Sequence, residues 1–216
     1  NISFDAQAVV QRSRGVSGRL NGGVTMLLKK NKVSVIWGEA KLTKPNEIVV
    51  SAPSKPAVQP QNPEPKDKLG PGTYTAKNII IATGARSRQL PSMPIDGKKI
   101  IGYREAMVLP QQPKSLIIVG SGAIGVEFAY FYNAMGTKVT IVEFMANIVP
   151  VEDEDVSKEL EKQYKKLGID IMTNASVESV DTAGAGVKAL VKKQDGSTVT
   201  LEADIVLSAV GVVANI

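Results

Sequence analysis

The segment from residue 114 to residue 143 constrains the fold of this chain most. An apolar run at residues 114–119 leads directly into Gly120, Ser121, Gly122, Ala123, Ile124 and Gly125, which together spell GxGxxG. Residues 123–135 have a helical pattern, and residues 138–142 form a second apolar run that ends at Glu143. A lone GxGxxG is weak evidence, but this one lies between a strand and a helix. The segment therefore predicts a βαβ unit.

The three glycines and the acidic residue predict the ligand of this unit. Gly120 permits a tight turn, Gly122 lets a pyrophosphate approach the backbone, and Gly125 lets the helix pack closely on the sheet. The amides of the helix that begins at Ala123 would face the phosphates with the positive end of the helix dipole. Glu143 can accept hydrogen bonds from a ribose diol and would repel a 2′-phosphate, and no arginine follows it within ten residues. We therefore expect NAD(H) rather than NADP(H).

The surrounding pattern extends this unit into a parallel sheet. We expect strands at 114–119, 138–142, 170–172 and 205–209, with helices at 123–135 and 152–167. Alternation of strands and helices is typical of a parallel sheet with crossover helices. Residues 177–181, 187–192 and 197–201 predict an antiparallel meander with Asp195 and Gly196 as its hairpin turn. The fold class is therefore α/β, with a Rossmann-like domain over residues 89–211.

The first 88 residues predict a separate unit. A helix is expected over 5–30, short antiparallel strands at 32–37, 47–51 and 72–76, and a fully apolar, buried strand at 78–82. Between them, residues 53–65 contain five prolines, and a charged tail continues to residue 68. Proline has no amide proton and cannot lie inside a helix or a central strand, so residues 53–68 are expected to form an extended surface excursion.

Composition restricts the chemistry of the chain. It has no cysteine and no histidine, so we expect no disulfide, no thiolate nucleophile, no histidine base and no metal site. The net charge of +5 is scattered and aromatic residues make up 5%, which argues against nucleic acid as a partner. No apolar run is long enough to span a bilayer. The absence of cysteine is compatible with a cytoplasmic location, and a chain that starts at Asn1 without a signal peptide is interpreted as an internal piece.

Several motifs in order along the chain resemble one enzyme family. They are the IIIATGA run at 79–85, IIV with the glycine loop and Val126-Glu127-Phe128, VTIVE at 139–143, and SAVG at 208–211. In combination they resemble the flavin-dependent pyridine nucleotide disulfide oxidoreductases. The acidic strand end and the IVPVED stretch at 148–153 are most similar to the dihydrolipoamide dehydrogenase branch.

The resemblance implies a role for each site residue. Gly120 to Gly125 would hold the pyrophosphate of NAD, Glu143 the adenosine ribose and Glu127 the nicotinamide side. Val177 and Gly211 would line the adenine and nicotinamide parts of the cleft, and Ile124 would lie nearest the hydride path. Backbone contacts to FAD are implied for Ala40, Thr83 and Gly84. Residues 1–88 would then be a partial FAD domain and residues 212–216 the start of the return to it.

A complete member of this branch would oxidise dihydrolipoamide, free or on a lipoyl domain, through a disulfide and FAD and pass the hydride to NAD⁺ as a homodimer. Its cysteine pair and its His-Glu acid-base pair are not in this chain. We therefore expect NAD(H) binding without dithiol oxidation and assign no catalytic residue.

Two alternatives stay open. A related flavoprotein NADH oxidase or coenzyme A disulfide reductase would be recognised by one cysteine, or a spaced pair, before Asn1. A non-catalytic NAD-sensing scaffold would dock a partner through the proline-rich excursion and lose it when residues 54–68 are deleted.

Overall fold

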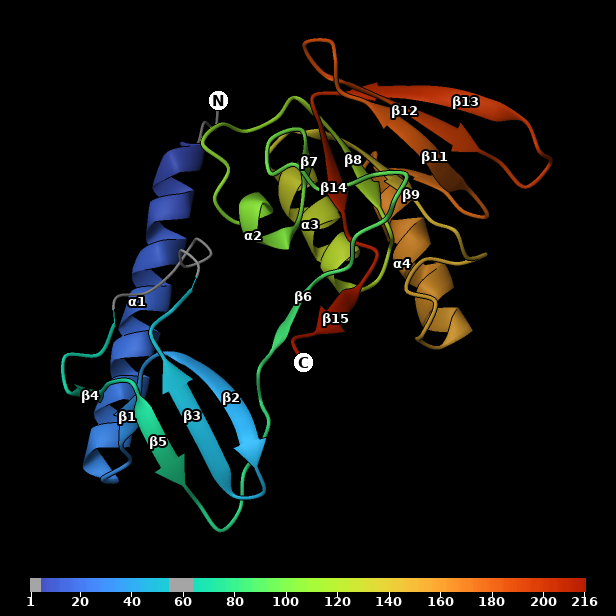
Figure 1. Cartoon of the computed structure of the whole chain (residues 1–216). Coiled ribbons are helices and arrows are strands. Elements are labelled where there is room, and N and C mark those ends of the chain that lie inside the picture. Colours follow the sequence, from blue (N-terminus) through green and yellow to red (C-terminus); the bar gives the residue numbers. More distant parts are fainter. Residues whose placement is uncertain (1–4, 55–63) are drawn as a thin grey trace. The chain divides into compact units, whose positions relative to one another are not determined.

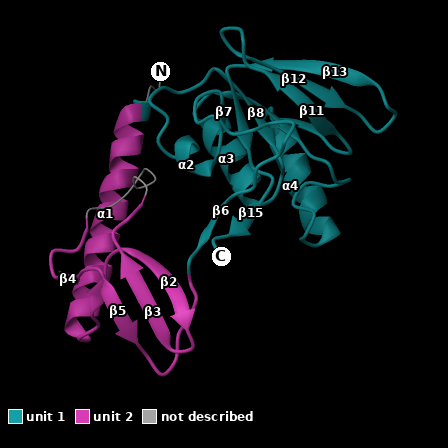
Figure 2. Cartoon of the chain, in the orientation of Figure 1, with its two compact units in different colours: residues 1–6, 83–216 teal, residues 7–82 magenta. Residues whose placement is uncertain are grey.

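The computed structural model of the chain describes residues 5–54 and 64–216 (Figure 1). The chain divides into two compact units, one with residues 7–82 and one with residues 1–6 and 83–216 (Figure 2). Each is described by itself below. Most of the proline-rich excursion predicted at 53–68, namely residues 55–63, lies outside the described residues.

A five-stranded parallel sheet organises the unit of residues 83–216. Its strand order is β10-β9-β8-β14-β7, with every neighbouring pair parallel. The strands are β7 (Ile100–Ile101), β8 (Ser115–Val119), β9 (Lys138–Val142), β10 (Asp170–Met172) and β14 (Ile205–Ser208), and the helices are α2 (Tyr103–Ala106), α3 (Ala123–Ala134) and α4 (Glu154–Lys166). The order puts β8 between β9 and β14. Ligands of such sheets bind beyond the carboxyl ends of the strands, where the strand order reverses.

Both faces of this sheet are covered, which explains why β8 is a continuous apolar run. Leu116 and Ile118 belong to a core that includes Val126 and Tyr132 of α3. Ile117 and Val119 face a second core with the meander on the other side of the sheet. The antiparallel meander consists of β11 (Ser176–Asp181), β12 (Val187–Lys192) and β13 (Thr198–Ala203), in that spatial order.

The predicted α/β class and its parallel sheet are confirmed. Some short elements of this unit were not predicted, namely α2, β7 and the antiparallel pair of β6 (Ala85–Ser87) and β15 (Val212–Ala214). Elements of two to four residues carry too few side chains to show a periodic pattern, and β6 and β15 pair across most of the unit's sequence.

The unit of residues 7–82 contains the predicted long helix, α1 (Ala6–Lys30), none of whose residues is buried. Its antiparallel sheet has the order β2-β3-β5. The strands are β2 (Glu39–Lys44), β3 (Glu47–Ser51) and β5 (Gly72–Thr75), and a parallel pair is formed by β1 (Val35–Ile36) and β4 (Lys68–Leu69).

Two strand predictions in this unit are wrong. The apolar run 78–82 forms no strand, and Ile80 and Ile81 are 89% and 66% exposed. A strand needs a hydrogen-bonding neighbour, and the described residues provide none beside this run. The strand expected at 32–37 shortens to β1, which pairs with β4 rather than with the antiparallel sheet. The sheet uses β2 in its place, whose six residues are all exposed.

Tyr132 gives the core of the larger unit a pH dependence. Its side chain is 4% exposed and its hydroxyl donates to the carbonyl oxygen of Ala106 at 2.6 Å. Burial raises the pKa of Tyr132 to about 12. The unfolded phenol titrates near 10, so between about pH 10 and pH 12 the unfolded chain releases a proton that the folded chain keeps. We expect the free energy of unfolding to fall as the pH rises through this window.

Urea unfolding at a series of pH values checks this prediction. Tyr132→Phe should show a shallower fall above pH 10 than the wild type, together with a loss of about 1 kcal/mol at pH 8 from the missing hydrogen bond. Part of the fall should persist in the variant, because burial also raises the pKa of Tyr164. An identical pH slope in both proteins would show that Tyr132 does not contribute.

Candidate functional site

The glycine loop between β8 and α3 uses its three glycines for two different reasons. Gly120 has a φ of +95°, and a Cβ there would come within 3.0 Å of the carbonyl oxygen of Ala209. A Cβ on Gly125 would come within 3.0 Å of the carbonyl oxygen of Gly120. A Cβ on Gly122, in contrast, would meet no protein atom within 4 Å. Packing therefore requires glycine at 120 and 125, whereas Gly122 borders open space.

That open space is a cavity of about 710 Å³ at the carboxyl ends of β8, β9 and β14. The strand order predicts a ligand site at this edge of the sheet. The cavity is lined by Arg88, Leu90, Val119, Gly120, Ser121, Gly122, Ala123, Ile124, Val142, Glu143, Phe144, Met145, Ala175, Ser176, Val177, Ala209, Val210 and Gly211.

Ser121 and Glu143, which line the cavity, form a buried hydrogen-bonded pair, and their exposed fractions are 0% and 6%. The amide and the hydroxyl of Ser121 each donate to Oε2 of Glu143 at 2.7 Å. The amide of Met145 donates to Oε1 of Glu143, also at 2.7 Å. These bonds fix the loop after β8 to the end of β9 before any ligand is bound.

A second bond holds the glycine loop from the side of α4. The amide of Val149 donates to the carbonyl oxygen of Ser121 at 2.9 Å. Val149 is buried and has a φ of +42°, a conformation that costs a β-branched residue free energy. The carbonyl of Val149 in turn accepts from the amide of Glu152 and from the hydroxyl of Ser157, which lies on α4. The loop is thus fixed by its tertiary contacts and not only by its own sequence.

Most of the residues predicted for NAD(H) lie together in this cavity. Gly120, Ser121, Gly122, Ala123, Ile124, Glu143, Val177 and Gly211 all line it. Gly125 is buried behind the loop, and Glu127 is exposed on α3 outside the lining residues.

The residues predicted for FAD belong to different units. Thr83 and Gly84 precede β6 and are bonded to Asn215: its side-chain amide donates to the carbonyl of Thr83 at 3.1 Å and its backbone amide to that of Gly84 at 3.0 Å. Ala40 is exposed on β2 in the unit of residues 7–82. The contacts of these three residues with FAD stay predictions.

Several lining residues were not predicted. Phe144 and Met145 follow Glu143 directly and are 75% and 49% exposed. Their position after a strand end was the signal that could have identified them. Arg88 and Leu90 reach the cavity from the segment after β6, and no sequence pattern pointed to them.

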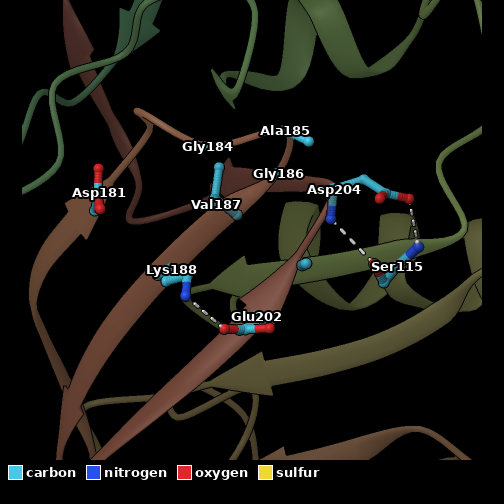
Figure 3. A pocket seen from close by; sticks show the side chains of 10 residues that line it. Ser115, Asp181, Gly184, Ala185, Gly186, Val187, Lys188, Glu202 and Asp204 are labelled. Atoms are coloured by element: carbon cyan, nitrogen blue, oxygen red, sulfur yellow. Dashed lines mark hydrogen bonds and ion pairs between the residues drawn. The ribbon is translucent and has the colours of Figure 1, made fainter.

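A smaller cavity of about 310 Å³ opens at the other end of β8, near Ser115 (Figure 3). Several of its polar groups have partners in the protein: Lys188 pairs with Glu202 at 3.0 Å, and Asp204 accepts from the amide of Ser115 at 3.1 Å. The hydroxyl of Ser115 also accepts from the amide of Asp204 at 3.0 Å. The Lys188–Glu202 pair joins β12 to β13 within the meander, and the Ser115–Asp204 bonds join β8 to the residue between β13 and β14. Because these polar groups already have partners in the protein, the larger cavity is the better candidate for a ligand.

The family of this chain follows from comparison with known proteins. The model of the pyridine nucleotide-disulphide oxidoreductase family matches residues 3–216. The chain belongs to this family. Its oxidoreductase relatives include a dihydrolipoyl dehydrogenase of Rhizobium etli, 56% identical over 216 residues, and one of Chlorobaculum tepidum, 42% identical over 212 residues. The predicted resemblance is thereby confirmed.

The match covers only part of these family members. The chain is covered to 100% and 98%, but it spans 45% and 42% of the two relatives. Among solved structures, LpdA from Mycobacterium tuberculosis aligns with a TM-score of 0.79 at 30% identity, covering 99% of this chain and 44% of that one. The flavoprotein disulfide reductase RclA from Escherichia coli aligns with a TM-score of 0.77 at 25% identity, with coverage of 99% and 44%. None of the helices in the described residues has the length and apolarity to cross a membrane.

Proposed function

We propose that the cavity at the carboxyl ends of β8, β9 and β14 binds NAD(H). The observation that carries this proposal is the open space beside Gly122. Gly122 lines the cavity, and a Cβ added there would meet no protein atom within 4 Å. The amides at the start of α3 supply hydrogen-bond donors and the positive end of a helix dipole to a pyrophosphate placed there. Phe144 also lines the cavity and is exposed, so its ring offers a flat surface for a base.

Glu143 supports NAD(H) over NADP(H) within this proposal. Its carboxylate has about four acceptor positions, and three of them are used by Ser121 and Met145. The fourth is free for a ribose hydroxyl, which can donate a hydrogen bond. A 2′-phosphate in its place has no proton to donate at neutral pH and would repel the carboxylate.

The proposed function of the whole protein is that of a dihydrolipoyl dehydrogenase, the name that its relatives carry. NAD⁺ supplies the hydride-accepting ring when it is bound, and the residues of this chain hold and orient it. FAD contacts at Ala40, Thr83 and Gly84, a nicotinamide-side role of Glu127, a homodimer, and dihydrolipoamide or a lipoyl domain as the dithiol are parts of this proposal. So are the domain limits 1–88, 89–211 and 212–216. A cytoplasmic location belongs to it as well and is compatible with the cysteine-free composition.

A fluorescence titration of the chain with NADH and NADPH tests the proposed function. We expect NADH to bind and NADPH to bind about five- to a hundredfold more weakly, because a carboxylate facing a 2′-phosphate costs on the order of 1–3 kcal/mol. Absence of NADH binding would contradict the proposed function. Equal affinity for both nucleotides would contradict the role given to Glu143.

Glu143→Gln keeps the shape of this side chain and removes its charge. We expect the preference for NADH to fall towards unity, because the repulsion of the 2′-phosphate is lost. Glu152→Gln removes the same charge from an exposed residue outside the cavity and should leave the preference unchanged. A preference that falls equally in both variants would mean that net charge, and not Glu143, discriminates the nucleotides.

A further inference from the structure

Charge is unevenly distributed around the cavity. Among the described residues that line it, Arg88 is the only cation and Glu143 the only anion. The glycine loop brings amides and a helix dipole, worth about half a positive charge, to a pyrophosphate that carries two negative charges. A cation on another wall of the cavity would add to this partial neutralisation.

The backbone of Arg88 is separated from the glycine loop by the segment that follows β14. Its amide donates to the carbonyl oxygen of Gly211 at 3.0 Å, just beyond the end of β14. β14 pairs with β8 as far as Ser208 and Val119. The amide of Ala209 then donates to the carbonyl of Val119 at 2.8 Å. Arg88, residues 209–211 and the start of the glycine loop therefore form one continuous edge of the cavity.

The guanidinium of Arg88 is available to a ligand. The residue is exposed, and its side chain has no hydrogen-bond acceptor among residues 5–54 and 64–216. Arg86, two residues earlier, is different. Its Nη1 donates to the carbonyl oxygen of Ala214 at 3.0 Å and to Oδ1 of Asn215 at 3.1 Å, and the residue does not line the cavity. Arg86 therefore binds β15 and its neighbour, whereas Arg88 faces the ligand space.

We propose that Arg88 is a further NAD(H)-binding residue, whose guanidinium binds the pyrophosphate on the side opposite the amides at Gly122 and Ala123. The inference rests on the proposed function and extends it to a residue outside the glycine motif. Arginine suits this role because its planar fork donates two parallel hydrogen bonds to phosphate oxygens and always carries a charge.

Titrations with NADH, ADP-ribose and adenosine test this assignment in the full chain. ADP-ribose keeps the pyrophosphate and lacks the nicotinamide, and adenosine lacks both. We expect Arg88→Ala to weaken NADH and ADP-ribose by the same factor, about ten- to a hundredfold, and to leave adenosine unchanged. Arg88→Lys should recover part of the loss, since it keeps the charge without the fork.

Lys114→Ala is the matched control. Lys114 precedes β8 at the opposite end from the glycine loop, about 20 Å from Gly120 along the strand, and its removal costs the same unit of charge. Its affinity for NADH should stay within twofold of the wild type. Urea unfolding of each variant should give the wild-type midpoint.

Each other outcome overturns the assignment. Weaker NADH binding with unchanged ADP-ribose binding would place Arg88 at the nicotinamide. Weaker adenosine binding would show that the cavity itself had changed, and unchanged binding of all three would leave Arg88 without a role. Wild-type protein that binds no NADH would refute the proposed function as well, whereas normal binding by Arg88→Ala would refute only the inference about Arg88.

Discussion

Gly125→Ala is expected to lower the free energy of unfolding by on the order of 3 kcal/mol. The new Cβ would overlap the carbonyl oxygen of Gly120, a backbone atom that cannot rotate away. Ala209 Cβ closes the other side at 3.4 Å, so α3 can retreat only by pulling away from the end of β8. Forcing extra atoms into such a well-packed position costs about 1–3 kcal/mol, and more where the clash is with backbone.

Urea unfolding monitored by circular dichroism measures this effect. The matched control is Gly122→Ser, three residues earlier in the same loop. Gly122 is the N-cap of α3 with φ −65° and ψ 179°, a conformation open to any residue, and serine is a preferred N-cap. Its unfolding midpoint should match or exceed that of the wild type. Similar stability of Gly125→Ala and Gly122→Ser would mean that the loop is not packed as described.

How far the fold could be predicted depended on which residues are buried. The parallel sheet and the meander could be predicted because their strands bury one or both faces, as the alternating burial of β12 shows. The run at 78–82 is equally apolar, but Ile80 and Ile81 have no neighbouring strand in the described chain and stay exposed. An apolar sequence predicts burial, but it does not show whether a neighbouring strand is there to pair with it. β2 is the opposite case, a strand held by its pairing with β3 and without a buried face.

In the candidate site, residues that are close in the sequence could be predicted, and residues that meet only through the fold could not. The glycine loop and Glu143 lie within one βαβ unit, so their spacing alone predicted that they would meet. The hydrogen bonds that Ser121 makes to Glu143 could not be predicted, because spacing does not specify side-chain partners. Arg88 reaches the cavity only through a bond to Gly211, far away in the sequence. Residues brought in by such pairings carry no local signal and need the structure to reveal them.

Gly122→Asp is expected to abolish NADH binding, with a loss of affinity of more than a hundredfold, while the protein stays folded. Aspartate is among the best N-cap residues, so its carboxylate can accept from the free amides at the start of α3 and the stability of the helix should not fall. The same carboxylate would occupy the open space beside Gly122 and present a negative charge to the pyrophosphate. It would thus compete for the very amides that the proposal assigns to the phosphates.

Comparison with Gly122→Ser separates charge from bulk. Serine adds a side chain of similar reach without the charge, so it should weaken NADH less than aspartate does. Isothermal titration calorimetry with NADH and adenosine provides the measurement, and adenosine, which has no phosphate, should bind all three proteins with closer affinities than NADH does. If Gly122→Asp bound NADH like the wild type, the pyrophosphate could not lie against the glycine loop, because a carboxylate at Gly122 and a bound phosphate cannot share the same few amides at the start of α3.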